Sequence, residues 1–304
     1  MSAGWVAGSV RARALTRCRL GPDAARRLAA TGSLDAALRE LAGTGYGRSV
    51  HPGLTVAEAQ HEVVGTVLWN LRVLAGWLPR DGVAMLRTLA AWFELANVDE
   101  MLVAGNGPSF ELGALETAWS QLRAAGPSAL RTALAASAWQ DPGGDSARAV
   151  RLGMRVRYTA WLAGLGEPAR SWAAGAAALL LAGEQLAVDR VTDPGTLRPV
   201  LALLGAAAAR AGSPAELRAG LPSHAGWVLA GVGGHADLWR AEATWRLRVE
   251  QDGLRLLRTS GLERDAVLGA VAVMACDALR VRAALEVAAR GGGAGQLEAY
   301  DELA

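Results

Sequence analysis

The sequence predicts an all-α protein, and three observations support that fold class. Apolar residues recur at spacings of three and four along almost the whole chain of 304 residues, which is the period of a helix with one buried face. Alternating runs of β-branched and aromatic residues, which mark strands, are missing. Breaks rich in Gly and Pro divide the chain into about ten predicted helices with short connections.

The predicted helices are separated by turn-forming residues and begin at recognisable caps. In chain order the breaks fall at Gly21-Pro22, Gly43 to Gly53, Pro79 to Gly82, Ala104 to Pro108, Gly126-Pro127, Asp141 to Ser146, Gly166 to Pro168, Thr192 to Thr196, Ala211 to Glu216, Gly220 to Gly226 and Gly291 to Gly293. Three predicted starts have a cap: Ser33 before Leu34, Thr55 with Glu58 three residues on, and Ser213-Pro214 with Glu216 in the first turn.

Three apolar runs of 11 residues each, 173–183, 199–209 and 266–276, predict buried core helices. A membrane-spanning helix needs about 20 apolar residues, and the N-terminus lacks the basic-then-apolar order of a secretion signal. Cys18 and Cys276 stand far apart without a CxxC partner, so neither a zinc cluster nor a disulfide framework is indicated. We therefore expect a protein of the reducing cytoplasm.

All 31 basic residues are arginine, because the chain has no lysine, and the net charge is +2. A chain without lysine cannot form the usual Walker A phosphate loop, a Schiff base or a pyridoxal phosphate anchor. Eight arginines between Arg11 and Arg48, against three acidic residues, could bind nucleic acid or anionic lipid from one exposed face. We interpret them instead as the solvated side of a helix pair.

Metal and catalytic motifs are incomplete. Glu58 and His61 have the Glu-x-x-His spacing of carboxylate-bridged di-iron bundles, but no other histidine has an acid three positions earlier. His61 also begins "HEVVG", in which Gly65 takes the place of the second histidine of a zinc protease helix. A Gly-x-Ser-x-Gly elbow is missing, and "GVGGHA" at 231–236 lacks the third glycine and the βαβ context of a dinucleotide loop. No catalytic residue, metal ligand or cofactor is predicted.

A weak internal repeat suggests three similar helical lobes. "ELANVD" at 94–99, "EQLAVD" at 184–189 and "DALRVR" at 277–282 each have an acid followed four residues later by valine. They begin 90 and 93 residues apart. The predicted lobes cover approximately 1–125, 126–214 and 215–304.

A helical wheel through the first copy places Asn97 near the centre of its apolar face. Glu94 flanks this face and Asp99 points away from it. A polar group in the core line must find a hydrogen-bond partner or cost about 1–3 kcal/mol, and we expect Glu94 to lie within its reach. In the third copy Asp277 and Arg280 occupy the corresponding positions and could form an i,i+3 ion pair.

The repeated segments resemble the recurring motif of the C/d family of central coupling subunits in archaeal and vacuolar-type rotary ATPases. In that motif an acid, two residues of any type, an asparagine, an aliphatic residue and usually a base close a helix. The matching residues are Glu94, Asn97 and Val98 in the first copy, Glu184 and Val188 in the second, and Asp277, Arg280 and Arg282 in the third. The N-terminal region is similar as well, with the "L..T.Y" ending at Leu41, Thr44 and Tyr46.

Membership would imply a non-catalytic coupling subunit without cofactors. Such a subunit is a funnel of three helical lobes around a central socket, lying on the cytoplasmic face of the membrane. Its partners are the central stalk and the ring of proton-carrying membrane subunits, between which it transmits torque. Asp99 and Asp189 replace the base of the motif, and Ala187 and Arg280 replace its asparagine. These departures leave open an all-helical adaptor of the same fold that binds another protein; an enzyme with an inter-lobe pocket has no motif behind it.

Overall fold

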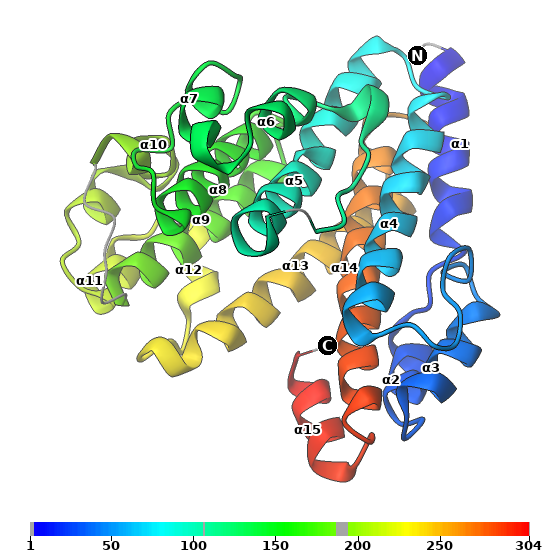
Figure 1. The fold of residues 1–304 in the computed structure, drawn as a ribbon. Coiled ribbons are helices and arrows are strands. Elements are labelled where there is room, and N and C mark those ends of the chain that lie inside the picture. The colour runs from blue at the N-terminus through cyan, green and yellow to red at the C-terminus, as the bar shows by residue number, and fades with distance from the viewer. Residues whose placement is uncertain (1–2, 106, 187–193, 304) are drawn as a thin grey trace. The chain divides into compact units, whose positions relative to one another are not determined.

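The computed structural model describes residues 3–105, 107–186 and 194–303, and all of its regular structure is helical (Figure 1). These residues form fifteen α-helices and four short 3-10 helices, without a strand. The predicted all-α class is confirmed. The helices outnumber the roughly ten predicted because several are short: α6 (Trp119–Ala125) and α7 (Leu130–Ala135) each cover only part of the stretch between two predicted breaks, and α12 (Ser223–Gly226) lies in a predicted break. Helices this short carry too few turns to show a period in the sequence.

Contacts divide the chain into two compact units. The first comprises 1–83 and 246–304 and the second comprises 84–245. The division falls within α5 (Arg80–Ala104) and α13 (Leu238–Thr259). Both borders of the predicted lobes, near residues 125 and 214, lie inside the second unit, so the division into three lobes remains a prediction.

The first unit is built around one long buried helix, α14. Its complete helices are α1 (Ala3–Thr16), α2 (Pro22–Ala29), α3 (Leu34–Ala42), α4 (Val56–Ala75), α14 (Arg264–Ala289) and α15 (Ala294–Leu303). Every residue from 266 to 274 is buried, as the apolar run at 266–276 predicted. Helices α1, α2 and α4 pack against α14, and Figure 1 shows α1 and α4 beside it.

The N-terminal helix of this unit is held by the C-terminal part of the chain. The guanidinium of Arg13 donates to the carbonyl oxygens of Leu257, Ser260 and Gly261, the Ser260 bond being 2.7 Å long. These carbonyls lie at the end of α13, where no further helical turn can satisfy them. The arginine-rich start of the chain is therefore more than a solvated surface, because Arg13 joins two segments about 245 residues apart.

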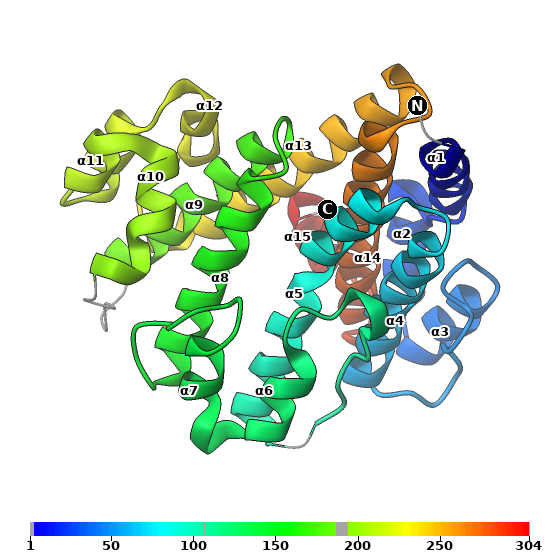
Figure 2. The same cartoon turned by 90° about the horizontal axis from the view of Figure 1, so that it is seen from above.

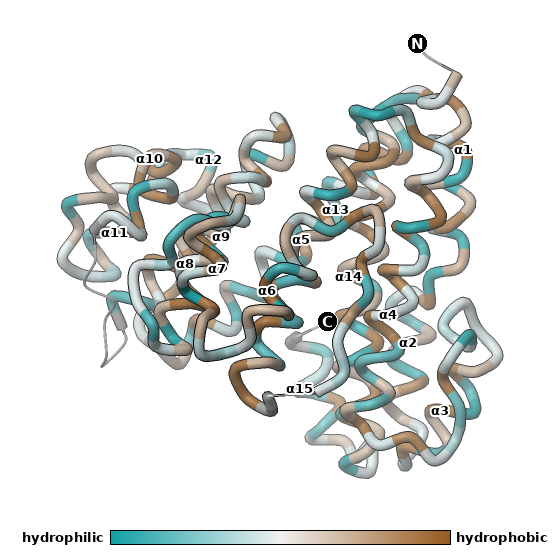
Figure 3. Tube along the Cα trace, turned by 45° about the horizontal axis from the view of Figure 1, so that its top comes forward, coloured by the Kyte–Doolittle hydropathy of each residue, from teal (hydrophilic) through white to brown (hydrophobic). Residues whose placement is uncertain are grey.

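The second unit has a core of small and branched apolar residues. Its complete helices are α6, α7, α8 (Ala147–Ala163), α9 (Ala169–Leu186), α10 (Pro194–Arg210), α11 (Pro214–Gly220) and α12. Helices α8, α9 and α10 pack side by side (Figure 2), and residues such as Ala178, Leu181, Val200 and Leu204 are buried between them and their neighbours. The colour of the tube in Figure 3 alternates between hydrophilic and hydrophobic along the helices, as expected of amphipathic helices.

The predicted helix starts are confirmed where the structure describes them. Thr55 and Glu58 form a capping box at α4, and the side chains of Ser33 and Ser213 accept from the third residue of α3 and α11. Of the predicted break at Thr192 to Thr196, positions 192 and 193 lie outside the described residues, and Pro194 to Thr196 form the first turn of α10 instead. Across 3–105, 107–186 and 194–303, no helix combines the length and the apolar character needed to cross a bilayer.

Candidate functional site

Glu94 is completely buried on α5 and holds a segment more than twenty residues further along the chain. Its carboxylate accepts the backbone N–H groups of Thr117 and Ala118, the Ala118 bond being 3.0 Å long. The indole Nε1–H of Trp139 donates to the second carboxylate oxygen at 2.7 Å. The two N–H groups stand just before α6, where a helix start leaves donors without partners. One acid thus fixes the start of α6 and the aromatic residue that follows α7.

Burial governs the protonation of Glu94. Removal of the carboxylate from water raises its pKa above the usual value, although the bonds from Thr117, Trp139 and Ala118 oppose that shift. The nearby carboxylate of Glu116 raises the pKa further, and no cation among the described residues lowers it. The carboxylate of Glu94 is therefore stabilised by hydrogen-bond donors rather than by an ion pair.

Asn97, one turn beyond Glu94, fastens the chain that returns along the helix. Its side-chain amide donates to the carbonyl of Phe110 at 2.9 Å and accepts the N–H of the same residue at 2.6 Å. The expected polar partner for this core residue exists, but the expectation that Glu94 supplies it is wrong. The reason is that the carboxylate oxygens of Glu94 accept hydrogen bonds from the start of α6. The backbone of Phe110 instead gives Asn97 both a donor and an acceptor.

Asp277, on α14 of the first unit, has the same kind of environment as Glu94. This completely buried carboxylate accepts the backbone N–H groups of Leu20 at 2.9 Å and Gly21 at 2.8 Å. The phenol of Tyr46 donates to it at 2.8 Å. Leu20 and Gly21 stand directly before α2, and Tyr46 follows α3. An acid near the C-terminus therefore holds the segment near the N-terminus in the way that Glu94 holds the start of α6.

A second acid and a cation surround Asp277. Arg280 makes two bonds to Glu250, of 3.0 and 2.6 Å, and all three side chains are buried. The distance from Arg280 to Asp277 is 3.8 Å, so the predicted i,i+3 ion pair exists but is longer than the pair with Glu250. Burial and the negative charge of Asp277 raise the pKa of Tyr46 well above its ordinary value, which keeps this phenol a donor.

We call Glu94 and Asp277, each with the donors that it accepts, the anchors of the two units. The aromatic donor of each anchor belongs to a turn that occurs in both units, which we call the aromatic turn. In the first unit Thr44 donates its hydroxyl to the carbonyl of Leu41 at 2.7 Å and accepts the N–H of Tyr46 at 3.2 Å. The second unit contains the matching set, Leu134, Ser137 and Trp139: Ser137 donates at 2.8 Å to the carbonyl of Leu134 and accepts the N–H of Trp139 at 3.1 Å.

Sequence reasoning found the first aromatic turn through its resemblance to a family motif and missed the second. The signal was present, because Leu, Ser or Thr, and an aromatic residue have the same spacing in both turns. Leu134 also follows Leu41 by 93 residues, the same interval that separates Glu184 from Asp277. Substitution of Ser for Thr and Trp for Tyr preserves the hydrogen-bond roles while it hides the identity of the residues.

The middle copy of the motif is organised differently. Glu184, at the end of α9, pairs with Arg148 of α8, and Val188 lies outside the described residues. Before α11, where an anchor of the same kind would act, the N–H of Gly212 donates at 2.8 Å to Glu216, four residues away. The indole of Trp227 donates to the carbonyl of His224, three residues away, at 2.9 Å. These two donors of the middle region therefore bond to acceptors within four residues of them in the chain.

The remaining predicted residues have simpler roles. Val98 is buried beside the anchor of the second unit. Asp99 is about one third exposed and pairs with Arg151 at 2.7 Å, so its predicted outward direction is compatible with a surface ion pair. Arg282 is half-buried, and this burial lowers the pKa of its guanidinium. Sequence reasoning missed Glu250, because this residue of α13 belongs to none of the recognised motifs.

These hydrogen bonds hold segments together that lie far apart in the sequence. Within the described ranges, no group of three or more His, Cys, Asp or Glu side chains is arranged to hold a metal ion. Comparisons with known proteins find no family model that matches the chain and no curated protein that matches it. The chemistry of the site therefore follows from its own contacts: buried acids accept backbone N–H groups and fix the starts of α2 and α6.

Proposed function

We propose that this protein is a non-catalytic coupling subunit of a V-type or A-type rotary ATPase. It would link the central stalk to the proton-carrying membrane ring on the cytoplasmic face of the membrane, during ATP-driven or ATP-synthesising ion transport. The observation that carries the proposal is the equivalence of two motif acids, Glu94 and Asp277. Each accepts two consecutive backbone N–H groups and one aromatic donor at the start of a short helix.

A torque-transmitting part has to resist deformation, and the anchors supply that property. Long helices alone leave the short helices between them free to open, because helix ends carry unsatisfied backbone groups. A buried carboxylate that accepts two such groups adds charge-assisted hydrogen bonds, about twice as strong as neutral ones. The last acid of the motif also holds the N-terminal segment, so both ends of the chain are tied into the first unit.

A second candidate is an all-helical adaptor of the same ancestry that binds a different protein. The observation in its favour is the departure of the middle copy from the family motif, with Ala187 in place of the asparagine and Asp189 in place of the base. A protein released from the rotary machine would no longer need three equivalent struts. The two candidates therefore agree on the fold and differ in the partner.

The test is co-expression with the stalk and ring subunits encoded in the same genome, followed by native mass spectrometry of the detergent-solubilised complex. We expect the chain to co-purify with both the stalk and the ring in one assembly. As a matched pair, Asp277→Asn should reduce this assembly, whereas Glu286→Gln on the exposed side of the same helix should not. A folded chain that associates with neither partner, or a genome whose neighbouring genes lack the catalytic subunits, would favour the adaptor.

A further inference from the structure

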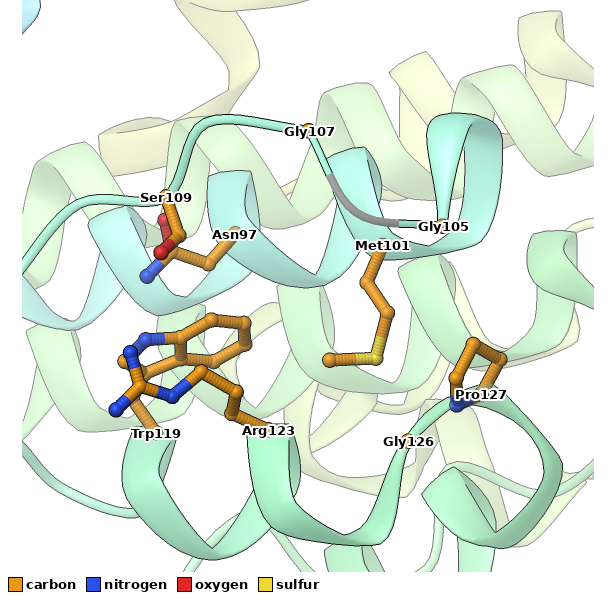
Figure 4. Close-up of a pocket in the computed structure, with 9 residues that line it drawn as sticks. All are labelled: Asn97, Met101, Gly105, Gly107, Ser109, Trp119, Arg123, Gly126 and Pro127. Carbon is orange, nitrogen blue, oxygen red and sulfur yellow. The ribbon is translucent and has the colours of Figure 1, made fainter.

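A small pocket of about 110 Å³ in the second unit is lined in part by Asn97, the residue that bonds to the backbone of Phe110 (Figure 4). The side chains that define it are Asn97, Met101, Ser109, Trp119, Arg123 and Pro127. In Figure 4 the polar ends of Asn97, Ser109, Trp119 and Arg123 lie toward one end, while Met101 and Pro127 lie toward the other. The pocket therefore has a polar end and an apolar end.

The polar end holds a hydrogen-bond donor that lacks an acceptor. Trp119 is 3% exposed, and among the described residues its indole Nε1–H finds no partner. A buried donor without an acceptor is costly and rare in native structures. Trp139, by contrast, shows the normal situation for a buried indole, since its Nε1–H donates to Glu94 at 2.7 Å. The neighbours of the orphan N–H of Trp119 enclose it, so an acceptor from outside the chain reaches it when those side chains shift.

Arg123 makes the acceptor more specific. One of its nitrogens bonds to Glu111 at 2.8 Å, and a guanidinium has five N–H donors in total, so donors remain for a ligand. The side chain of Ser109 adds a hydroxyl. Donors of this kind suit an oxyanion, and the partial neutralisation of Arg123 by Glu111 suits a single negative charge better than a double one.

We propose that this pocket binds a carboxylate carried on a short aliphatic chain. The carboxylate accepts from Trp119 and Arg123 at the polar end, and the chain of two to four carbons contacts Met101 and Pro127. The volume of about 110 Å³ suits a group of this size, because pockets that hold drug-sized molecules measure about 300–1,000 Å³. The ligand is either a free short-chain acid or a glutamate side chain of a protein partner; both present the same chemistry.

The experiment follows the indole N–H signals of the ¹⁵N-labelled full chain by NMR during titration with butyrate. The Trp119 signal should shift and saturate, while the Trp139 signal, already bonded to Glu94, should stay in place. Butyramide, which has nearly the same shape without the charge, should not produce a saturable shift. Capped tripeptides Gly-Glu-Gly and Gly-Gln-Gly form the second arm: tighter binding of the Glu peptide than of butyrate assigns a protein side chain, and the reverse assigns a free acid.

Variants separate this binding from general effects on the fold. Arg123→Gln lies on an exposed side chain and should weaken butyrate binding about tenfold, as loss of a charge-assisted bond does. Trp119→Phe removes the N–H and with it the reporter signal, so its binding of butyrate is measured by calorimetry, where a similar loss is expected. Glu111→Gln frees Arg123 and should tighten binding about two- to fivefold. Arg131→Gln, which disrupts a surface ion pair away from the pocket, should change nothing.

Three results would overturn the proposal. The first is a Trp119 signal that neither butyrate nor the Glu peptide moves. The second is equal binding of butyrate and butyramide, which would remove the carboxylate from the argument. The third is an Arg123→Gln variant with unchanged affinity, which would place the ligand elsewhere.

Discussion

The anchors of the two units have the same donors and opposite electrostatic surroundings. Asp277 lies beside Arg280 and Glu250, so its charge belongs to a buried network that contains a cation. Glu94 is surrounded by donors and by the carboxylate of Glu116, and burial raises its pKa. Both carboxylates therefore accept two backbone N–H groups and one aromatic donor. Only Asp277 has an ion pair as well.

The described contacts of the middle copy are of a different kind. Glu216 accepts the N–H of Gly212 within one short segment, and Glu184 pairs with the partly exposed Arg148. Neither of these two contacts belongs to a buried network like the one around Asp277. Loss of an acid should then cost most where a buried network depends on it and least where its described partner is exposed.

The largest effect is expected for Asp277→Ala, at about 4 kcal/mol of unfolding free energy. The substitution leaves two backbone N–H groups and the Tyr46 hydroxyl buried without an acceptor, and it removes the more distant of the two carboxylates beside the buried Arg280. Urea unfolding should measure the loss, and hydrogen exchange should show faster exchange at Leu20 and Gly21. Glu286→Ala, on the exposed side of α14, serves as the control and should cost about 1 kcal/mol or less.

Glu94→Ala should cost less, about 2–3 kcal/mol. It leaves the N–H groups of Thr117 and Ala118 and the Trp139 indole without an acceptor, but no described cation loses a partner, and the cost of burying the carboxylate disappears with it. Hydrogen exchange should accelerate at Thr117 and Ala118. If this substitution proved more destabilising than Asp277→Ala, the ion pair would not be the source of the difference between the anchors.

The raised pKa of Glu94 predicts a smaller, pH-dependent effect. The folded chain keeps this proton at pH values where the unfolded chain, with a pKa near the ordinary value of 4.5, has released it. Stability from this group is therefore complete below pH 4.5 and decreases as the pH rises through the folded-state pKa. The free energy of unfolding of wild type minus that of Glu94→Gln should fall as the pH rises above about 4.5 and level off above the folded-state pKa. A difference that grows with pH would mean that the hydrogen bonds outweigh the burial.

The sequence predicted the all-α class, the caps and the buried apolar runs at 173–183 and 266–276 because each depends on local periodicity or on neighbouring residues. The prediction that 199–209 is a buried core helix was wrong: only Val200, Leu204 and Ala208 of this run are buried, and Gly205 interrupts the helix with a φ of 86°. The sequence also placed Asn97 in the core line of its helix with Glu94 flanking it, and it singled out Asp277 as an acid of the repeated motif. It could not provide their partners. Thr117, Ala118, Leu20 and Gly21 take part through backbone N–H groups, which every residue except proline possesses. The wrong prediction of a contact between Glu94 and Asn97 has the same origin, because each of these side chains accepts a backbone N–H from another segment.

The smallest effect is expected for Glu184→Ala, and it decides whether the motif has two anchors or three. Its partner Arg148 is 42% exposed, and pairs of this kind contribute about 0–1 kcal/mol. Exchange at Gly212 should be unchanged in Glu184→Ala and faster in Glu216→Ala, because Glu216 accepts that N–H. If Glu184→Ala instead cost as much as Glu94→Ala, Glu184 would hold a distant segment as the other acids do. The middle copy would then be a third strut, which would weaken the case for an adaptor and strengthen that for the coupling subunit.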